Sequence, residues 1–225
     1  MPRKTELWVI GIFVAVVVLG TIVAAVTSGG TTTASTQFVS TTVPALTSAD
    51  WSRGNTAAAV SVTEYGDFQC PACGAYEPIM QQLTKDFGSS VRFAFRNYPL
   101  YQIHQDAMMS AQAAEAAGLQ GKYWEMHDLL YAKQNEWSLE AANTVTAKFF
   151  DGYARSLGLD VAKFDTDINS AGVKAKIQKD MASGDAAKVD HTPTFFVNLQ
   201  QIPNPANYAD FKAAIEAALS TTTAQ

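Results

Sequence analysis

The chain's only two cysteines, Cys70 and Cys73, have two residues between them, so their thiols can form a disulfide or share a metal ion. Residues 57–65 before them are largely apolar and rich in Val, Thr and Tyr, which predicts a short buried strand. Residues 74–87 after them repeat apolar side chains at helical spacing. The cysteines therefore lie where a strand ends and a helix begins. Unpaired N–H groups and the helix dipole stabilise an anion there, so we expect Cys70 to be the nucleophile and Cys73 the resolving thiol.

An uncharged apolar segment occupies residues 7–26, and twenty helical residues are enough to span a bilayer. Arg3 and Lys4 precede this segment, whereas the next charged residue after it is Asp50, so residues 1–6 should stay cytoplasmic. We expect an uncleaved, single-pass transmembrane anchor, with the rest of the chain outside the cytoplasm at the cell membrane. A cleaved signal peptide is the alternative, although its apolar region usually has only about 7–15 residues.

More than half of residues 27–48 are Ser or Thr and none is charged, which indicates a flexible spacer. Residues 49–220 have the length and apolar content of one folded domain, and the polar residues 221–225 are expected to form a disordered tail. The whole chain has a net charge of −5 and no basic cluster. We therefore expect no nucleic acid among its partners.

The folded domain contains patterns of both strands and helices. Residues 50–55 are typical of a turn, in which Trp51 is expected to be a packing residue, and residues 91–96 alternate as a second strand would. A long helical block, at about 103–185, follows before strand patterns return. We predict helices at 105–117, 122–134, 144–157, 161–170, 173–181 and 208–219, and further strands at 194–197 and 199–202.

Four short motifs, in this order along the chain, resemble those of one known family. They are DFQCPAC at 67–73, FRNYPL at 95–100, GKYW at 121–124 and TPTFFVN at 192–198. Over residues 51–219 the chain is similar to the DsbA-like thiol:disulfide oxidoreductases, in a membrane-anchored form. The resemblance implies an α/β protein with a thioredoxin-like fold and an inserted α-helical domain, preceded by one N-terminal transmembrane helix.

The resemblance also implies roles for individual residues. Cys70 matches the attacking cysteine and Cys73 the buried resolving one, while Pro193 matches a cis-proline that lies against the disulfide. The backbone of Thr192, before that proline, would pair with an extended substrate. Glu64 matches a buried acid that exchanges a proton with the resolving cysteine, and burial would raise its pKa. An exposed strand carboxylate is the alternative interpretation of Glu64.

Few of the residues around the cysteines carry a charge that could change the pKa of the thiols. Pro71 and Ala72, between the two thiols, are expected to meet the substrate, but neither carries a positive charge. His191 stands where many relatives have glycine, and when protonated it could stabilise the nucleophilic thiolate. It could also be an exposed loop residue without a redox role. The other two histidines, His104 and His127, are expected to pack or to cap helices.

The function implied by the resemblance is donation of the Cys70–Cys73 disulfide to exported proteins while they fold. The cysteine pair would be the only redox group, with neither a cofactor nor a metal. Unfolded exported proteins would be the substrates, and a quinone-linked membrane protein of the DsbB or vitamin K epoxide reductase type would reoxidise the cysteines. Too few residues separate the expected anchor from the domain for an added dimerisation domain, so we expect a monomer.

Other interpretations of the cysteine pair stay open. A membrane-tethered disulfide reductase or isomerase would use the same thiols in another direction, and a peptide-binding, chaperone-like module would use the groove beside Pro193 without turnover. A structural zinc ion usually needs four protein ligands, of which the cysteines supply only two. A purely structural disulfide that closes so small a loop would add little stability.

Overall fold

The computed structural model describes residues 39–140, 145 and 149–223 of the chain. The chain divides into residues 1–35 and 36–225, and every described residue belongs to the second unit. The expected cytoplasmic segment and the expected anchor both lie outside the described residues. Within the described part, none of the helices has the length and apolar character needed to cross a membrane.

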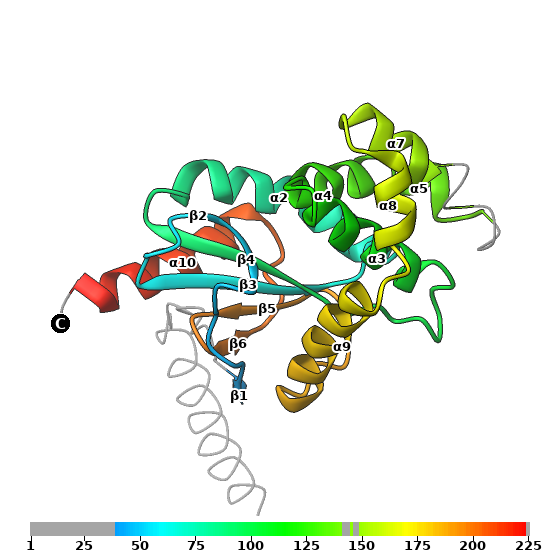
Figure 1. The fold of residues 1–225 in the computed structure, drawn as a ribbon. Helices are drawn as coiled ribbons and strands as arrows, with labels where there is room; N and C mark the ends of the chain where they lie inside the picture. The colour runs from blue at the N-terminus through cyan, green and yellow to red at the C-terminus, as the bar shows by residue number, and fades with distance from the viewer. Residues whose placement is uncertain (1–38, 141–144, 146–148, 224–225) are drawn as a thin grey trace, which may run out of the picture. The chain divides into compact units, whose positions relative to one another are not determined.

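Strands occur at both ends of the described domain, with a run of helices between β4 and β5 (Figure 1). The strands are β1 (Val39–Thr42), β2 (Trp51–Gly54), β3 (Val60–Gly66), β4 (Val91–Asn97), β5 (Thr194–Val197) and β6 (Gln200–Ile202). The helices are α2 (Pro71–Phe87), α3 (Ala107–Gly118), α4 (Tyr123–Ala132), α5 (Gln134–Trp137), α7 (Asp151–Ser156), α8 (Val161–Asp167), α9 (Ala171–Ala186) and α10 (Tyr208–Thr223).

The strands form one mixed sheet with the order β1-β6-β5-β3-β4-β2. The central strands β3 and β4 are parallel, with Val60 opposite Val91, and α2 is the crossover between them. The other pairs are antiparallel, and β5 and β6 form a hairpin before α10. This topology confirms the thioredoxin-like α/β fold that the resemblance implied.

Helices α2 and α10 pack against one face of the sheet. Val60 and Val62, which alternate along β3, belong to one buried cluster with Phe93 of β4. Leu83 of α2 and Phe211 of α10 complete this cluster, and both are fully buried. Burial of this apolar surface fixes α2 across the sheet and therefore fixes the position of its first turn at the end of β3.

The opposite face of β3 and β5 packs towards α9. Tyr65 and Phe196 are buried on this side, with their ring centroids 5.7 Å apart. The hydroxyl of Tyr65 lies 2.7 Å from that of Ser183 on α9. A Cβ added at Gly184 would come within 2.7 Å of the Tyr98 ring, so only glycine permits this close approach of the helix.

The inserted helices have a core of their own, which continues to the cysteines. Trp137, Phe150 and Phe164 are fully buried there, together with the alanine-rich helix α3. Phe68 and Cys73 belong to the same cluster. In Figure 1 helices α3 to α8 gather at one end of the sheet, on the right. The expected helical insertion is therefore confirmed, and it packs directly on the loop that carries the cysteines.

Two expected irregular segments are strands in the structure. The expected turn at 50–55 contains the edge strand β2, in which Trp51 pairs with Phe95 of β4. The second half of the expected spacer contains β1, which pairs with β6, and Val43 after it is buried. In both cases a distant strand supplies the backbone hydrogen bonds, so the local sequence does not reveal the strand.

The ends of two helices also differ from the prediction. Helix α10 continues to Thr223, so the expected tail at 221–225 is wrong up to that residue. Hydroxyls in its last turn donate to carbonyl oxygens four residues earlier, which satisfies these polar side chains within the helix. The helix predicted at 144–157 is represented by the shorter α7, from Asp151, and several residues of its first half lie outside the described part.

Candidate active site

Cys70 is the N-cap residue of α2, with φ −69° and ψ 120°, and Pro71 is the first helical residue. Proline suits this position because the first helical residue donates no hydrogen bond within the helix and has a φ near that of the proline ring. The N–H of Gly74 donates to the carbonyl oxygen of Cys70 at 3.2 Å, which closes the first turn. The expected strand-to-helix junction is confirmed, and Cys70 lies at the positive end of the helix dipole.

The surroundings of Cys70 lower the pKa of its thiol to about 5. The largest cause is the hydrogen bond from the Cys73 thiol, which stabilises the thiolate. Thr192 and the backbone N–H groups of Ala72 and Cys73 act in the same direction, while burial opposes them. At neutral pH Cys70 is therefore a thiolate, which is the nucleophilic form of cysteine.

Cys73, in contrast, is only 1% exposed. Burial raises the pKa of its thiol well above the ordinary value, and its hydrogen bond to Cys70 and the charge of Glu64 raise it further. The N–H of Asp67 lies 3.5 Å from the Cys73 sulfur and has the opposite, weaker effect. The two thiols thus differ in acidity, and Cys73 keeps its proton when Cys70 has lost its own.

The loop before β5 lies beside Cys70. Its Thr192–Pro193 peptide bond is cis, as the resemblance implied. The Cys70 sulfur lies 3.3 Å from the carbonyl oxygen of Thr192. Asn204 donates to the carbonyl oxygen of Pro193 at 2.8 Å and holds the loop from the other side.

Glu64 lies on β3 two residues after Val62, so both side chains point to the face that α2 covers. Glu64 is 4% exposed, so its burial is confirmed and the alternative of an exposed carboxylate is wrong. Burial raises its pKa well above the usual range, and the nearby Glu77 adds to this effect, whereas Arg53 opposes it. A carboxyl group in water loses its proton at neutral pH, whereas the buried Glu64 can keep its proton close to Cys73.

His191 is exposed and its hydrogen-bond partner is not a cysteine. Its Nδ1 lies 2.7 Å from the carboxylate of Asp190, and no hydrogen bond joins it to either thiol in the part of the chain described here. This arrangement favours the interpretation of His191 as a loop residue without a redox role. Pro71 and Ala72 are both exposed beside Cys70, where an incoming substrate could meet them.

Asp67, which is buried, pairs with the partly exposed His104, and the sequence did not predict this contact. The Asp67 carboxylate accepts the N–H of Gln69 at 2.8 Å and that of Leu100 at 3.0 Å. His104 Nδ1 lies 2.7 Å from the second carboxylate oxygen. His104 therefore holds the active-site loop, where only packing or helix capping was expected. Asp67 stands in a recognised motif, but its partners are 33 and 37 residues away in the sequence, so no local signal links them.

Two glutamines join the active-site loop to the inserted helices, and no local pattern in the sequence predicts either contact. The side-chain amide of Gln134 donates to the carbonyl oxygens of Phe68 and Cys70 at 2.7 and 2.9 Å. Gln69 donates to the carbonyl oxygen of Ser138 at 2.7 Å. The Gln134 bonds give the Phe68 carbonyl oxygen a donor and the Cys70 carbonyl oxygen a second one, and together the three bonds hold the active-site loop against the insertion.

A groove of about 440 Å³ runs beside Cys70 at the edge of the insertion. Two large apolar side chains on it, Ile103 and Leu139, are 73% and 88% exposed. The groove is lined by Gln69, Pro71, Ile103, His104, Gln105, Ser138 and Leu139. Exposed apolar side chains next to a nucleophilic thiol can contact an unfolded chain.

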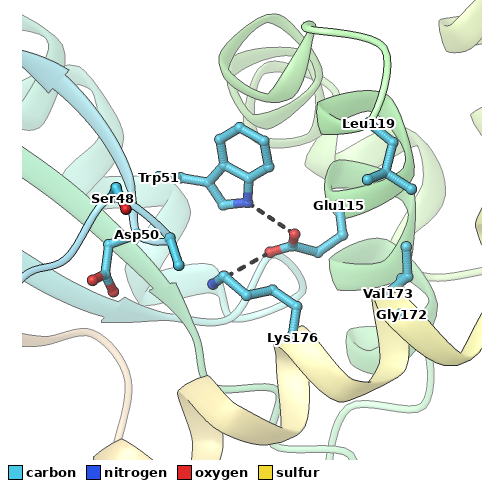
Figure 2. Close-up of a pocket in the computed structure, with 9 residues that line it drawn as sticks. Ser48, Asp50, Trp51, Glu115, Leu119, Gly172, Val173 and Lys176 are labelled. Carbon is cyan, nitrogen blue, oxygen red and sulfur yellow. Dashed lines mark hydrogen bonds and ion pairs between the residues drawn. The ribbon is translucent and has the colours of Figure 1, made fainter.

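A second pocket, of about 280 Å³, lies between the start of the domain and helices α3 and α9 (Figure 2). The indole N–H of Trp51 donates to Glu115 at 2.8 Å, and Lys176 lies 3.8 Å from the same carboxylate. The Trp51 ring stacks on Tyr123 with centroids 4.5 Å apart, which confirms Trp51 as a packing residue. Burial raises the pKa of Glu115 to about 7, against the effect of Lys176. These groups satisfy one another, so we interpret this pocket as structural.

Comparison with known proteins agrees with this geometry. A family profile described as Thioredoxin matches residues 47–217. BdbD from Bacillus subtilis, in its oxidised crystal structure, is 26% identical, with a TM-score of 0.70 over 82% of this chain and 99% of BdbD. A thioredoxin-like oxidoreductase from Silicibacter pomeroyi is also 26% identical, with a TM-score of 0.65 over 77% of this chain and 94% of its own. Wolbachia pipientis alpha-DsbA1, at 16% identity, shares the fold, with a TM-score of 0.69 over 80% of this chain and 97% of its own.

The site and these comparisons together define a thiol–disulfide oxidoreductase whose redox-active group is a cysteine pair. The chain belongs to the thioredoxin family, and its fold is like that of DsbA.

Several curated relatives are named as Na(+)/H(+) antiporters and are much longer than this chain. A Na(+)/H(+) antiporter NhaA 1 from Salinispora arenicola is 40% identical over 180 residues, which are 80% of this chain and 26% of the antiporter. NhaA 3 from Salinispora tropica is 39% identical over 188 residues, or 28% of its length. This chain thus spans about a quarter of the relatives it matches. The shared part is the thioredoxin-like domain of this chain, so the likeness gives no reason to assign ion transport to it.

Proposed function

We propose that this chain is a thiol:disulfide oxidase that donates the Cys70–Cys73 disulfide to proteins outside the cytoplasm. The observation that carries the proposal is the position of Cys70 at the start of α2, where the Cys73 thiol and backbone N–H groups lower the pKa of the Cys70 thiol to about 5. A thiolate that is stabilised in this way makes the reduced enzyme more stable relative to its disulfide form. An enzyme with a stable reduced form gives its disulfide away readily.

In the proposed reaction a substrate thiolate attacks the sulfur of Cys70 in the oxidised enzyme. The bond between Cys70 and Cys73 breaks, and Cys73 leaves and takes up a proton, for which Glu64 is the proposed donor. A second substrate thiolate then attacks the substrate sulfur of the mixed disulfide and releases Cys70 as a thiolate. Two electrons pass from the substrate to the enzyme, and the substrate gains one disulfide.

The proposed substrates are exported proteins that have not yet folded. The backbone of Thr192 would pair with an extended segment of the substrate, while Pro71 and Ala72 would lie against it. The exposed side chains of Ile103 and Leu139 support this choice, because an unfolded chain offers apolar residues that a folded surface hides.

DsbA-like proteins act on substrate proteins and are reoxidised by a membrane partner. For this chain we propose a quinone-linked partner of the DsbB or vitamin K epoxide reductase type. The proposed location rests on the sequence, in which the uncharged segment 7–26 follows two basic residues and would anchor a monomer with its catalytic domain outside the cytoplasm.

The direct test is to mix the oxidised full chain with reduced, unfolded ribonuclease in a buffer without another oxidant. We expect about one substrate disulfide per enzyme molecule, because the cysteine pair holds two electrons when reduced. Mass spectrometry of alkylated products counts these disulfides, and the Cys70→Ser variant is the matched control that should transfer none. If the oxidised chain instead transfers no disulfide, and the reduced chain gives its two electrons to insulin and is left oxidised, it is a reductase. Binding without any change in thiols would indicate the peptide-binding module.

A further inference from the structure

Two buried carboxyl groups and a buried imidazole line a small cavity under the active-site helix. Glu64, Glu77 and His127 are 4%, 5% and 1% exposed, and they come from β3, α2 and α4. Together with Arg53 they line a cavity of about 10 Å³. That is close to the space that one water molecule needs, and four of the nine residues that line the cavity are polar.

The hydrogen bonds of His127 define which of its nitrogens is free to accept a proton. Its Nδ1 lies 2.9 Å from a carboxylate oxygen of Asp128. Burial raises the pKa of Asp128, but the His127 hydrogen bond and the charge of Arg53 bring it below the usual value, so Asp128 is a carboxylate. Since a carboxylate only accepts hydrogen bonds, Nδ1 donates to Asp128, and in the neutral imidazole Nε2 is the nitrogen with the lone pair. His127 Nε2 is buried without a hydrogen-bond partner in the described part of the chain.

Aromatic rings enclose this imidazole and separate it from bulk water. The nearest rings belong to Phe95, Trp124, Tyr131 and Phe68, with centroids at 4.8, 4.9, 5.1 and 5.3 Å. The titratable and charged groups around it are Glu64 on β3, Glu77 on α2, Arg53 on β2, and Tyr123, Asp128 and Tyr131 on α4.

The outer end of this cluster reaches the surface through Asp128, whose side chain is 39% exposed. One ligand atom from each of Glu77, His127 and Asp128 lies within 4.8 Å of the others. A metal ion at this place would have to compete with Arg53, which lies 3.4 Å from Glu77 and 3.1 Å from Asp128. The cluster therefore has its positive charge already, and Nε2 of His127 still lacks a partner.

We propose that His127 is the proton carrier between Glu64 and solvent, through one water molecule in this cavity. The inference rests on the proposed function. When Cys73 attacks a mixed disulfide during reoxidation, its S–H bond breaks and the proton passes to one oxygen of the Glu64 carboxyl group, which releases its own proton from the other oxygen. Glu64 gives that proton to the cavity water, which gives one of its own to His127 Nε2, and the imidazolium releases its Nδ1 proton beside Asp128 to solvent. During substrate oxidation the same protons move inward to the departing Cys73.

The test measures two steps separately. The first is attack of Cys70 on oxidised glutathione, and the second is resolution of the resulting mixed disulfide by Cys73. The reduced, purified full chain is mixed with oxidised glutathione, quenched with acid at set times and analysed by mass spectrometry. In His127→Gln we expect resolution of the Cys70–glutathione disulfide to slow about tenfold or more at pH 7, since a positioned acid or base usually contributes at least that much. The ratio of its rates in H₂O and D₂O should rise, because proton transfer becomes the slow step. Formation of the mixed disulfide should not change.

Two further variants make the result specific. The Asp128 side chain is partly exposed, so the Asp128→Asn variant should fold even if His127→Gln does not. Because Asp128→Asn removes the negative charge beside the imidazolium, resolution of the mixed disulfide should slow several-fold. Trp124→Phe disturbs the aromatic enclosure but keeps His127, and it should leave the isotope ratio unchanged. Equal resolution rates and isotope ratios in wild type, His127→Gln and Asp128→Asn would overturn the relay. If the wild type itself forms no mixed disulfide on Cys70, the proposed function fails, and the relay fails with it.

Discussion

Cys70 and Cys73 are three residues apart, yet their surroundings change their acidity in opposite directions. Cys70 receives the Cys73 hydrogen bond and backbone N–H groups at a helix start, and its pKa falls to about 5. Cys73 is enclosed by the core of the insertion, and burial raises the pKa of its thiol. The difference assigns attack to one sulfur and resolution to the other before any substrate arrives.

The first prediction concerns this acidity. Alkylation of the reduced protein by iodoacetamide should rise with pH with a midpoint of about 5, because only the thiolate reacts. In Cys73→Ala the midpoint should move to higher pH, since the main donor to the Cys70 thiolate is lost. Mass spectrometry identifies the modified cysteine. A wild-type midpoint near about 8.5, the value of an ordinary thiol, contradicts the assignment.

The second prediction concerns the stability effect of Glu64. Burial raises the pKa of this carboxyl in the folded state, so above the unfolded pKa of about 4.3 the folded protein binds more protons than the unfolded one. The stability of the wild type should therefore fall as pH rises from that value towards the folded pKa. Glu64→Gln lacks this loss and should be the more stable protein at pH 7, but not below pH 4. Urea unfolding at both pH values checks this, and parallel pH curves would contradict it.

At the scale of elements, the position of the site depends on how α2 meets the inserted helices. The β3 and β4 ladder fixes the start of α2, and the insertion then covers the loop before it. Gln134 on α5 bridges the two by donating to the carbonyl oxygens of Phe68 and Cys70. The insertion thus supports the nucleophile directly.

A third prediction tests this bridge. Gln134→Leu has nearly the same size but removes the donor to the buried Phe68 carbonyl oxygen, while the Cys70 carbonyl oxygen keeps the Gly74 N–H. The change should cost about 1–3 kcal/mol of unfolding free energy. Gln120→Leu is the matched control, because Gln120 also makes two hydrogen bonds to backbone groups but lies at the surface. It should cost about 0.5 kcal/mol or less. Equal losses in the two variants, measured by urea unfolding, would show that Gln134 has no special role.

The elements that could be predicted from the sequence are those with a strong local pattern. Alternation along β4 and the apolar periodicity of α2 and α10 come from side chains that face the sheet core, so each pattern is visible within its own segment. Strands β1 and β2 could not be predicted, because their hydrogen bonds come from β6 and β4.

In the active site, too, residues in local motifs could be predicted, whereas contacts between distant residues could not. Cys70, Cys73, Glu64 and Pro193 were found because they stand in or near recognised motifs. The sequence does not say that His104 meets Asp67 or that His127 lies beside Glu77, since folding creates these contacts between residues far apart in the chain.

For the whole molecule, one buried ion pair connects the start of the described domain to the sheet. Arg96 on β4 donates to Asp50 at 2.7 Å and to the carbonyl oxygen of Pro44 at 3.1 Å, and it also bonds the hydroxyl of Tyr65 at 3.0 Å. Asp50 and Arg96 side chains are 8% and 4% exposed. The segment that leads into the domain is therefore part of its folded structure.

A fourth prediction concerns the proposed location. In intact cells that make the full chain, a membrane-impermeant maleimide should label Cys70 after mild reduction, because the catalytic domain is expected outside the cytoplasm. Cys70→Ser is the control for labelling of other sites, and a cytosolic protein with an exposed cysteine controls for leakage. Labelling of Cys70 only after the cells are lysed would contradict the proposed orientation.

The reduction potential of the Cys70–Cys73 pair tests the central claim most directly. The Cys70 pKa of about 5 lies between the values of about 3.5 for DsbA and about 7 for thioredoxin, whose potentials are about −120 and −270 mV. Equilibration of the protein in glutathione buffers, read by mass spectrometry after alkylation, gives the potential. We predict a value between these two and nearer to that of DsbA, with the reduced form melting at the higher temperature. A potential near that of thioredoxin, with the oxidised form the more stable, would contradict the oxidase and indicate a reductase.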